Sequence, residues 1–261
     1  MTLSIQEAMA RVPSWQGETG ILCQKIDAGV TNRNYRVVVG EQEFALRLNA
    51  PNSEALGLDR TQEMETLRLL EESGIGPIIV HCSPEDGLLV TRWIEGVRWS
   101  RDDIGEPDNI RRLAGRLREV HALPPIPGRL DPGARARAYI RVIESTGMAL
   151  PGPADAFIEE IESRWKPLAD AQLCLCHNDV VHTNIIDNGS LRIVDWEYAA
   201  MGNPLFDLAT ITQNHGYSPE QTEALLESYF GTVDDDRRDA MSAMQGIYDR
   251  LHVLWSLVRQ V

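Results

Sequence analysis

The chain has 261 residues, enough for one large domain or two lobes, and its 43% hydrophobic and 25% charged residues are ordinary for a globular protein. Its formal net charge of −14 argues against a nucleic-acid partner, which needs clustered lysine and arginine, whereas a cationic small molecule would be attracted. No apolar run approaches the roughly 18–20 residues that span a bilayer, so we expect no membrane insertion.

The ends and the cysteines indicate a reducing compartment. The first ten residues lack the basic flank and cleavage site of a secretory signal. Cys23, Cys82, Cys174 and Cys176 do not have the spacing of zinc ligands, although the last two share one face of an expected strand. We therefore expect buried free thiols in a cytoplasmic protein.

The first ninety or so residues favour strands arranged around one helix. Alternating apolar runs predict strands over residues 21–26, 35–39, 44–48, 78–82 and 88–93. Between the third and fourth strands, a helix is expected over residues 60–73, with Met64, Leu67 and Leu70 on one face and Gly74 as the stop signal.

After Trp93 the pattern becomes mainly helical. Helical spacing predicts helices near residues 109–123, 134–145, 154–166, 205–213, 219–230 and 237–260. The simplest division is a small sheet-rich lobe, residues 1–93, and a larger helical lobe, residues 94–261. This is an α+β architecture in which a cleft between the lobes would be the ligand site.

The most informative segment runs from residue 173 to residue 195. Short strands are expected before and after a loop that carries Asp179 and Asn184, and a further strand ends at Asp195. This loop and strand end would present two carboxylates and an amide to one site. The spacing is that of kinase-type phosphoryl transfer, in which the first Asp accepts the proton of a hydroxyl and the other two side chains hold Mg²⁺ against ATP. His177 is expected to pack and hydrogen-bond.

The nucleotide side needs a phosphate loop and a cation. Residues 29–34 connect two strands, and Thr31, Asn32 and Asn34 could touch phosphate oxygens, although an ordinary hairpin turn is the alternative. Arg47 is the one cation in an apolar strand and is expected to pair with Glu63 on the following helix, with Glu65 as a rival.

A connector between the lobes completes the predicted nucleotide site. Residues 91–96, with Trp93 and Ile94 at their centre, could hydrogen-bond adenine through the backbone.

These motifs together resemble the choline/ethanolamine kinase branch of the aminoglycoside phosphotransferase-like kinases. The resemblance is carried in order by residues 29–35, 46–48, 60–63, 76–77, 177–184 and 193–199. It implies a two-lobed protein-kinase-like fold and the use of ATP and Mg²⁺ to phosphorylate a small alcohol. It also implies that Asp207 is a structural residue that braces the catalytic loop.

The acceptor side follows from the same resemblance. Glu197 and Tyr198 match family positions near choline, and Trp255 matches the second tryptophan of a Trp-x-x-Trp-Ser pattern whose first tryptophan is His252 here. Aromatic faces and carboxylates suit a quaternary ammonium. Two alternatives remain: Trp255 as a core residue and Glu197 as a salt-bridge residue.

We therefore expect an ATP- and Mg²⁺-dependent kinase acting on a small, cationic amino alcohol, choline or ethanolamine first. The alternatives are the same chemistry on thiamine, an aminoglycoside, homoserine or another alcohol, and a nucleotide-binding protein without turnover. The intact Asp179, Asn184 and Asp195 disfavour the last. The sequence does not indicate an oligomeric state.

Overall fold

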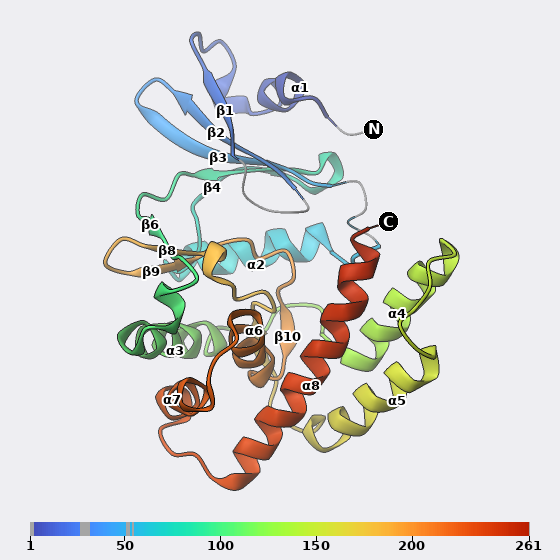
Figure 1. Ribbon diagram of the computed structural model, residues 1–261. Coiled ribbons are helices and arrows are strands. Elements are labelled where there is room, and N and C mark those ends of the chain that lie inside the picture. The colour runs from blue at the N-terminus through green and yellow to red at the C-terminus, as the bar shows by residue number, and fades with distance from the viewer. Residues whose placement is uncertain (1–2, 27–31, 51–52, 54, 261) are drawn as a thin grey trace.

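The computed structural model describes residues 3–26, 32–50, 53 and 55–260. An antiparallel sheet lies at one end of the molecule and most of the helices lie at the other (Figure 1). The predicted α+β architecture is therefore confirmed. Within the described ranges, the structure has no helix that is long and apolar enough to cross a membrane.

The N-terminal sheet has five strands in the order β1-β2-β3-β5-β4. Their bounds are Leu22–Ile26, Arg33–Val39, Gln42–Leu48, Ile79–Ser83 and Leu88–Arg92 for β1 to β5. All five were expected, but β2 and β3 each begin two residues earlier than predicted. The register pairs Asn34 of β2 with Arg47 of β3, so two predicted nucleotide residues lie side by side.

One face of this sheet is covered by a helix that the sequence did not indicate. Helix α1, Ile5–Ala10, begins at Ser4 with a reciprocal capping box, in which Ser4 and Glu7 each accept a backbone N–H of the other. Trp15, just after it, packs edge-on against Phe44 with ring centroids 5.2 Å apart. Together these residues form a small core that belongs to the sheet.

Helix α2, Arg60–Glu72, starts at Asp59, whose carboxylate accepts the N–H groups of the first turn. Of the expected apolar face, Leu67 and Leu70 are buried in the large core of the helical part rather than in the small core of the sheet, whereas Met64 is half-buried. Glu63 is buried on this helix, whereas Glu65 is exposed.

The helical part contains the six predicted helices. Their bounds are Pro107–His121, Pro132–Ser145, Ala154–Trp165, Leu205–His215, Pro219–Phe230 and Asp235–Val258 for α3 to α8. The long helix α8 packs against α4, α5 and α6 (Figure 1). The apolar stripe of α8, from Met241 to Leu254, is buried in this packing.

Short strands frame the catalytic segment. β7, Cys174–Cys176, pairs with β10, Ala200–Gly202, which the sequence did not indicate. β8, Ile185–Asp187, pairs with β9, Leu191–Ile193, and on its other side with β6, Val97–Arg98. The turn before β9 contains Gly189, whose φ of 96° suits glycine. These pairings fix both ends of the loop that carries Asp179.

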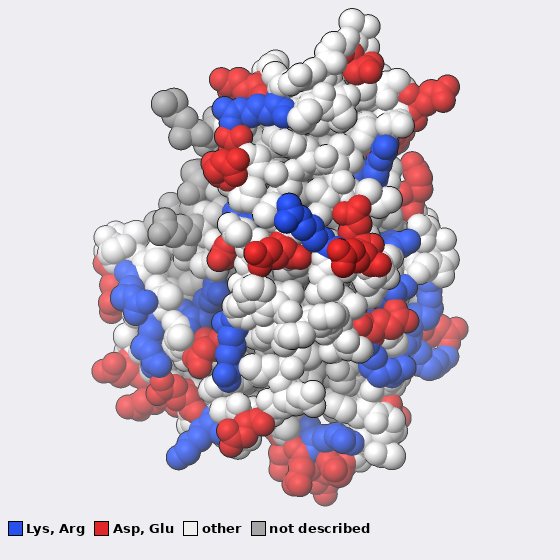
Figure 2. Space-filling view, turned by 180° about the vertical axis from the view of Figure 1, so that it is seen from behind, with Lys and Arg blue, Asp and Glu red and all other residues white. Residues whose placement is uncertain are grey.

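The surface and the cysteines refine two expectations. On the face shown in Figure 2, acidic and basic side chains are interspersed. All four cysteines are free, as predicted, but only Cys176 is fully buried; Cys23 is exposed because it lies on β1 at the edge of the sheet. The expectation of four buried thiols was wrong. The lobe boundary at residue 93 stays a prediction.

Candidate active site

The catalytic loop holds Asp179 through its neighbours. The Asp179 N–H donates to Nδ1 of His177 at 3.1 Å, and Nε2 of the same ring lies 3.0 Å from the Val194 carbonyl oxygen. The Asn184 amide Nδ2 donates to the Asp179 carboxylate at 3.2 Å and to its carbonyl oxygen at 3.1 Å. The sequence predicted that Asp179 and Asn184 share one site, and in the structure their side chains are hydrogen-bonded.

A buried carboxylate anchors this loop from behind. Asp207, near the start of α6, accepts the backbone N–H of His177 at 2.9 Å and that of Asn178 at 2.6 Å. Its Oδ2 also lies 2.9 Å from Nε2 of His121. This geometry is that of a brace under the catalytic loop, as the sequence resemblance implied.

Two residues of this segment have left-handed backbone conformations. Asn178 has φ 64° and Asp195 has φ 66°, and they are the two non-glycine residues with positive φ in the described part of the chain. Such conformations cost of order 1–3 kcal/mol each and collect at functional sites, where surrounding contacts enforce them. At Asp195 this conformation follows the end of β9, and the carboxylate contacts Arg47 of the sheet.

Arg47 connects the sheet to this segment. Its guanidinium donates to Glu63 at 2.6 Å, to Asn49 at 3.0 Å and to the Asp195 carboxylate at 3.2 Å. Burial lowers the pKa of Arg47, but the carboxylates of Glu63, Glu197 and Asp195 together outweigh it and raise the pKa above its usual value. The predicted pairing with Glu63 is therefore present, and the exposed Glu65 is not a partner.

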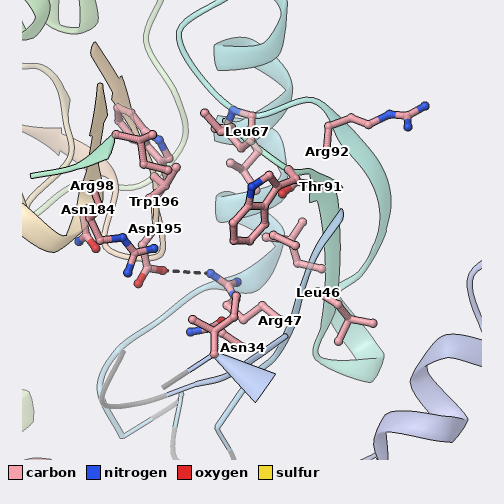
Figure 3. A pocket seen from close by; sticks show the side chains of 18 of the residues that line it. Asn34, Leu46, Arg47, Leu67, Thr91, Arg92, Arg98, Asn184, Asp195 and Trp196 are labelled. Atoms are coloured by element: carbon pink, nitrogen blue, oxygen red, sulfur yellow. Dashed lines mark hydrogen bonds and ion pairs between the residues drawn. The ribbon is translucent and has the colours of Figure 1, made fainter. Parts of the chain in front are cut away.

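A cavity of about 350 Å³ opens between the sheet and the catalytic segment. It is lined by five of the predicted nucleotide residues: Asn34, Arg47, Glu63, Trp93 and Ile94. Asn184 and Asp195 form its inner end. Figure 3 shows Arg47 and Asp195 pointing toward each other there, while Arg92 extends away.

The remaining two predicted nucleotide residues have other positions. Thr31 lies outside the described residues. Asn32 does not line this cavity; its amide donates to the Glu197 carboxylate at 2.8 Å, and its oxygen accepts the Ala50 N–H. Arg60 donates to the same Glu197 carboxylate at 2.7 Å. Glu197 is thus a buried ion-pair residue that ties α2 to the segment after Asp195.

A second cavity, of about 400 Å³, lies on the other side of Asn184 and Asp195. Asp179 and all four predicted acceptor residues line it: Glu197, Tyr198, His252 and Trp255. Trp255 also packs against the large core, and its indole N–H donates to the Tyr198 hydroxyl at 2.8 Å. Trp255 therefore both lines the cavity and packs against the core. Glu197 likewise both lines the cavity and forms an ion pair.

Sequence reasoning missed several residues of this second cavity. Tyr139, Phe206, Asn214 and Tyr248 contribute to its wall, and Arg135 and Arg259 add two cations. Tyr248 lies one turn before His252 on the stripe of α8, so helical spacing could have identified it. Tyr139 comes from α4, which no motif connects to the catalytic segment. The Arg259 guanidinium lies over the Trp255 ring, 4.7 Å from its centroid.

The acidic groups at the junction of the cavities suit a divalent cation. Burial, reinforced by the charge of Glu197, raises the pKa of Asp179 to about 7, and the same two causes raise the pKa of Asp195, although 29% of the Asp195 side chain is exposed. A cation between Asn184 and Asp195 would favour the ionised carboxylates. Oxygen donors of this kind are the ligands that Mg²⁺ prefers.

Comparison with known proteins agrees with this geometry. Residues 23–243 match the Phosphotransferase enzyme family. Protein LicA of Haemophilus influenzae is 26% identical over 212 residues, and Ethanolamine kinase 2 of Rattus norvegicus is 26% identical over 211; the matches cover 77% and 75% of this chain. They span only 60% and 54% of those two relatives.

Solved structures show the same fold. A choline/ethanolamine kinase family protein from Mesorhizobium loti superposes with a TM-score of 0.80 at 27% identity, covering 97% of this chain and 84% of that one. The choline kinase LicA from Streptococcus pneumoniae superposes with a TM-score of 0.81 at 23% identity, covering 96% and 88%, a likeness of fold. With the family match over most of its length, this chain belongs to the phosphotransferase enzyme family.

Proposed function

We propose that this protein transfers the γ-phosphoryl group of ATP to the hydroxyl of a small amino alcohol, choline or ethanolamine. The observation that carries the proposal is the pair of cavities that meet at Asn184 and Asp195, with Asp179 in the second. A nucleotide in the first cavity and an alcohol in the second would meet at these side chains. The relatives named choline and ethanolamine kinases support the same reaction.

The side chains at the junction have distinct roles in this proposal. Asp179, held by Asn184, accepts the proton of the acceptor hydroxyl. Arg47, fixed by Glu63, neutralises phosphate charge from the sheet side. Asn184 and Asp195 would hold Mg²⁺, which supplies charge neutralisation on the phosphates when bound. Trp93 and Ile94 in the connector, with Asn34, border the nucleotide.

The acceptor cavity favours a primary ammonium over a quaternary one. The Arg259 guanidinium lies over one face of Trp255, which is therefore not open to a bulky cation, and the centroid of the His252 ring lies 5.4 Å from that of the indole. The hydroxyls of Tyr198 and Tyr248 line the same cavity and can accept hydrogen bonds, which an –NH₃⁺ group can donate and a trimethylammonium cannot. Ethanolamine fits these features better than choline.

An acceptor screen tests the proposal. ADP release is measured with ethanolamine, choline, thiamine and an aminoglycoside, in the wild type and in Asp179→Ala. We expect the fastest turnover with ethanolamine and a loss of roughly 100- to 10,000-fold in kcat for Asp179→Ala, with ATP binding retained. Activity with only thiamine or only an aminoglycoside would show that the acceptor is not choline or ethanolamine. Near-normal turnover of Asp179→Ala would overturn the assignment of the base.

A further inference from the structure

A group of side chains of the kinds that can ligate a metal lies behind the catalytic loop, around the strand that leads into it. Cys174 and Cys176 share one face of β7, and their Sγ atoms are 3.7 Å apart. His121, at the end of α3, brings an imidazole to the same place. One ligand atom from each of the three residues lies within 4.8 Å of the other two.

The distance between the two sulfurs is compatible with a shared metal ion. Two sulfurs bound tetrahedrally to Zn²⁺ at about 2.3 Å are about 3.8 Å apart, which agrees with the 3.7 Å between the two Sγ atoms. Two thiolates and an imidazole are borderline-soft ligands that suit Zn²⁺ and are not those of Mg²⁺. Three protein ligands leave a fourth position to water.

The surroundings of His121 orient it for such a role. The Asp207 carboxylate lies 2.9 Å from Nε2, and metal-bound histidines commonly have a carboxylate on the nitrogen that does not bind the metal. Nδ1 would then be the nitrogen left for a metal, and it would have to give up its present contact with the Tyr229 hydroxyl at 2.6 Å. Cys176 is buried and Cys174 is half-buried, so a cation would enter past Cys174.

We propose that His121, Cys174 and Cys176 form a site for one thiophilic divalent cation of the Zn²⁺ type. Binding replaces the two S–H bonds by two S–Zn bonds and releases both protons to solvent. The site is separate from Asn184 and Asp195, which are oxygen donors. It is joined to the catalytic loop because Asp207, which holds His121, also accepts the backbone N–H groups of His177 and Asn178.

Cobalt titration of the metal-free full chain tests the site without using activity. Because Co²⁺ takes the same ligands as Zn²⁺, we expect one equivalent to produce the near-ultraviolet charge-transfer band of a cobalt–thiolate bond. Zn²⁺ should displace it, and a large excess of Mg²⁺ should not. Cys174→Ser should abolish the band, whereas Cys23→Ser, at an exposed thiol on β1, should keep it. No band in the wild type, or a band that Cys174→Ser retains, would overturn the proposal.

Thiol labelling of the wild type gives a second measurement that needs no variant. Alkylation of Cys174, followed by mass spectrometry, should slow at least tenfold when Zn²⁺ is added, which is the occupancy expected once free Zn²⁺ is roughly ten times the dissociation constant. Labelling of Cys23 in the same sample should not change. Equal labelling of Cys174 with and without Zn²⁺ would also overturn the site. Neither result bears on the proposed phosphotransfer.

Discussion

Replacing Asp207 by asparagine tests how the catalytic loop is anchored. The buried carboxylate accepts the N–H groups of His177 at 2.9 Å and Asn178 at 2.6 Å, and it pairs with His121. An amide keeps only one acceptor oxygen, so its NH₂ group must face at least one of these donors. An unsatisfied buried donor costs about 1–3 kcal/mol, and each hydrogen bond to a charged group contributes about 1.5–3 kcal/mol. We expect Asp207→Asn to lower the free energy of unfolding by about 3–5 kcal/mol.

Urea unfolding followed by circular dichroism measures this loss. Asp249→Asn is the matched control, because Asp249 is an exposed carboxylate on α8 that also accepts hydrogen bonds from a side chain, Gln213. It should unfold like the wild type. A total stability of about 5–15 kcal/mol makes the expected loss easy to resolve. A loss of less than about 1 kcal/mol for Asp207→Asn would refute the anchoring role.

The contribution of the Asp207 carboxylate to stability should depend on pH. Burial raises the pKa of Asp207, but its interactions with His121 and His177 together outweigh burial and hold the pKa below its usual value. A carboxylate with a lowered pKa in the folded state stabilises the protein above its unfolded-state pKa, and this contribution is lost as the pH falls through the folded-state value. The advantage of the wild type over Asp207→Asn should therefore be full at neutral pH and shrink in strong acid.

Three further predictions concern the reaction. Burial raises the pKa of Asp179 to about 7 in the metal-free protein, and a bound cation would lower it again. We therefore expect kcat/KM to rise with pH through the acid range and to level off at or below about 7, and a profile that is flat throughout that range would contradict the role of Asp179 as a base. Glu63→Gln should lower kcat/KM for ATP roughly 10- to 150-fold, equivalent to about 1.5–3 kcal/mol of the bond to Arg47, whereas Glu65→Gln should not; equal effects would refute the clamp. His252→Trp should lower the KM for choline about 2- to 30-fold, as expected for a new cation–π contact, and an unchanged KM would place residue 252 outside the site.

The fold was largely predictable because its elements carry regular patterns. The five strands of the sheet and the six helices of the larger part follow from alternating and helical spacing. The elements that the sequence analysis did not predict are short. β6 and β10 have two and three residues, too few for a pattern, and they exist because β8 and β7 offer them hydrogen-bond partners. α1 is held by a capping box of Ser4 and Glu7 that was present in the sequence but was not recognised.

The site divides in the same way. Residues within one motif, such as Asp179 and Asn184, keep a spacing that predicts their geometry. Glu63 could be distinguished from Glu65 only once the rotation of α2 was known. Contacts between distant segments, such as Asn32 with Glu197, depend on tertiary packing and have no signal in a single sequence. The group of His121, Cys174 and Cys176 was missed for this reason, because the two cysteines lie on β7 and His121 lies on α3.

Helix α2 sets how the two ends of the molecule can move. Its Leu67 packs in the large core, and its Arg60 is bonded to Glu197, so the helix is tied to the helical part as well as to the sheet. Its Glu63 nevertheless holds Arg47, which belongs to a strand of the sheet. A rocking motion that opens the cleft would therefore hinge between α2 and the sheet and would stretch the Arg47–Glu63 pair. Opening the cleft for a nucleotide would therefore also change the position of Arg47, the residue that contacts the phosphates in the proposed reaction.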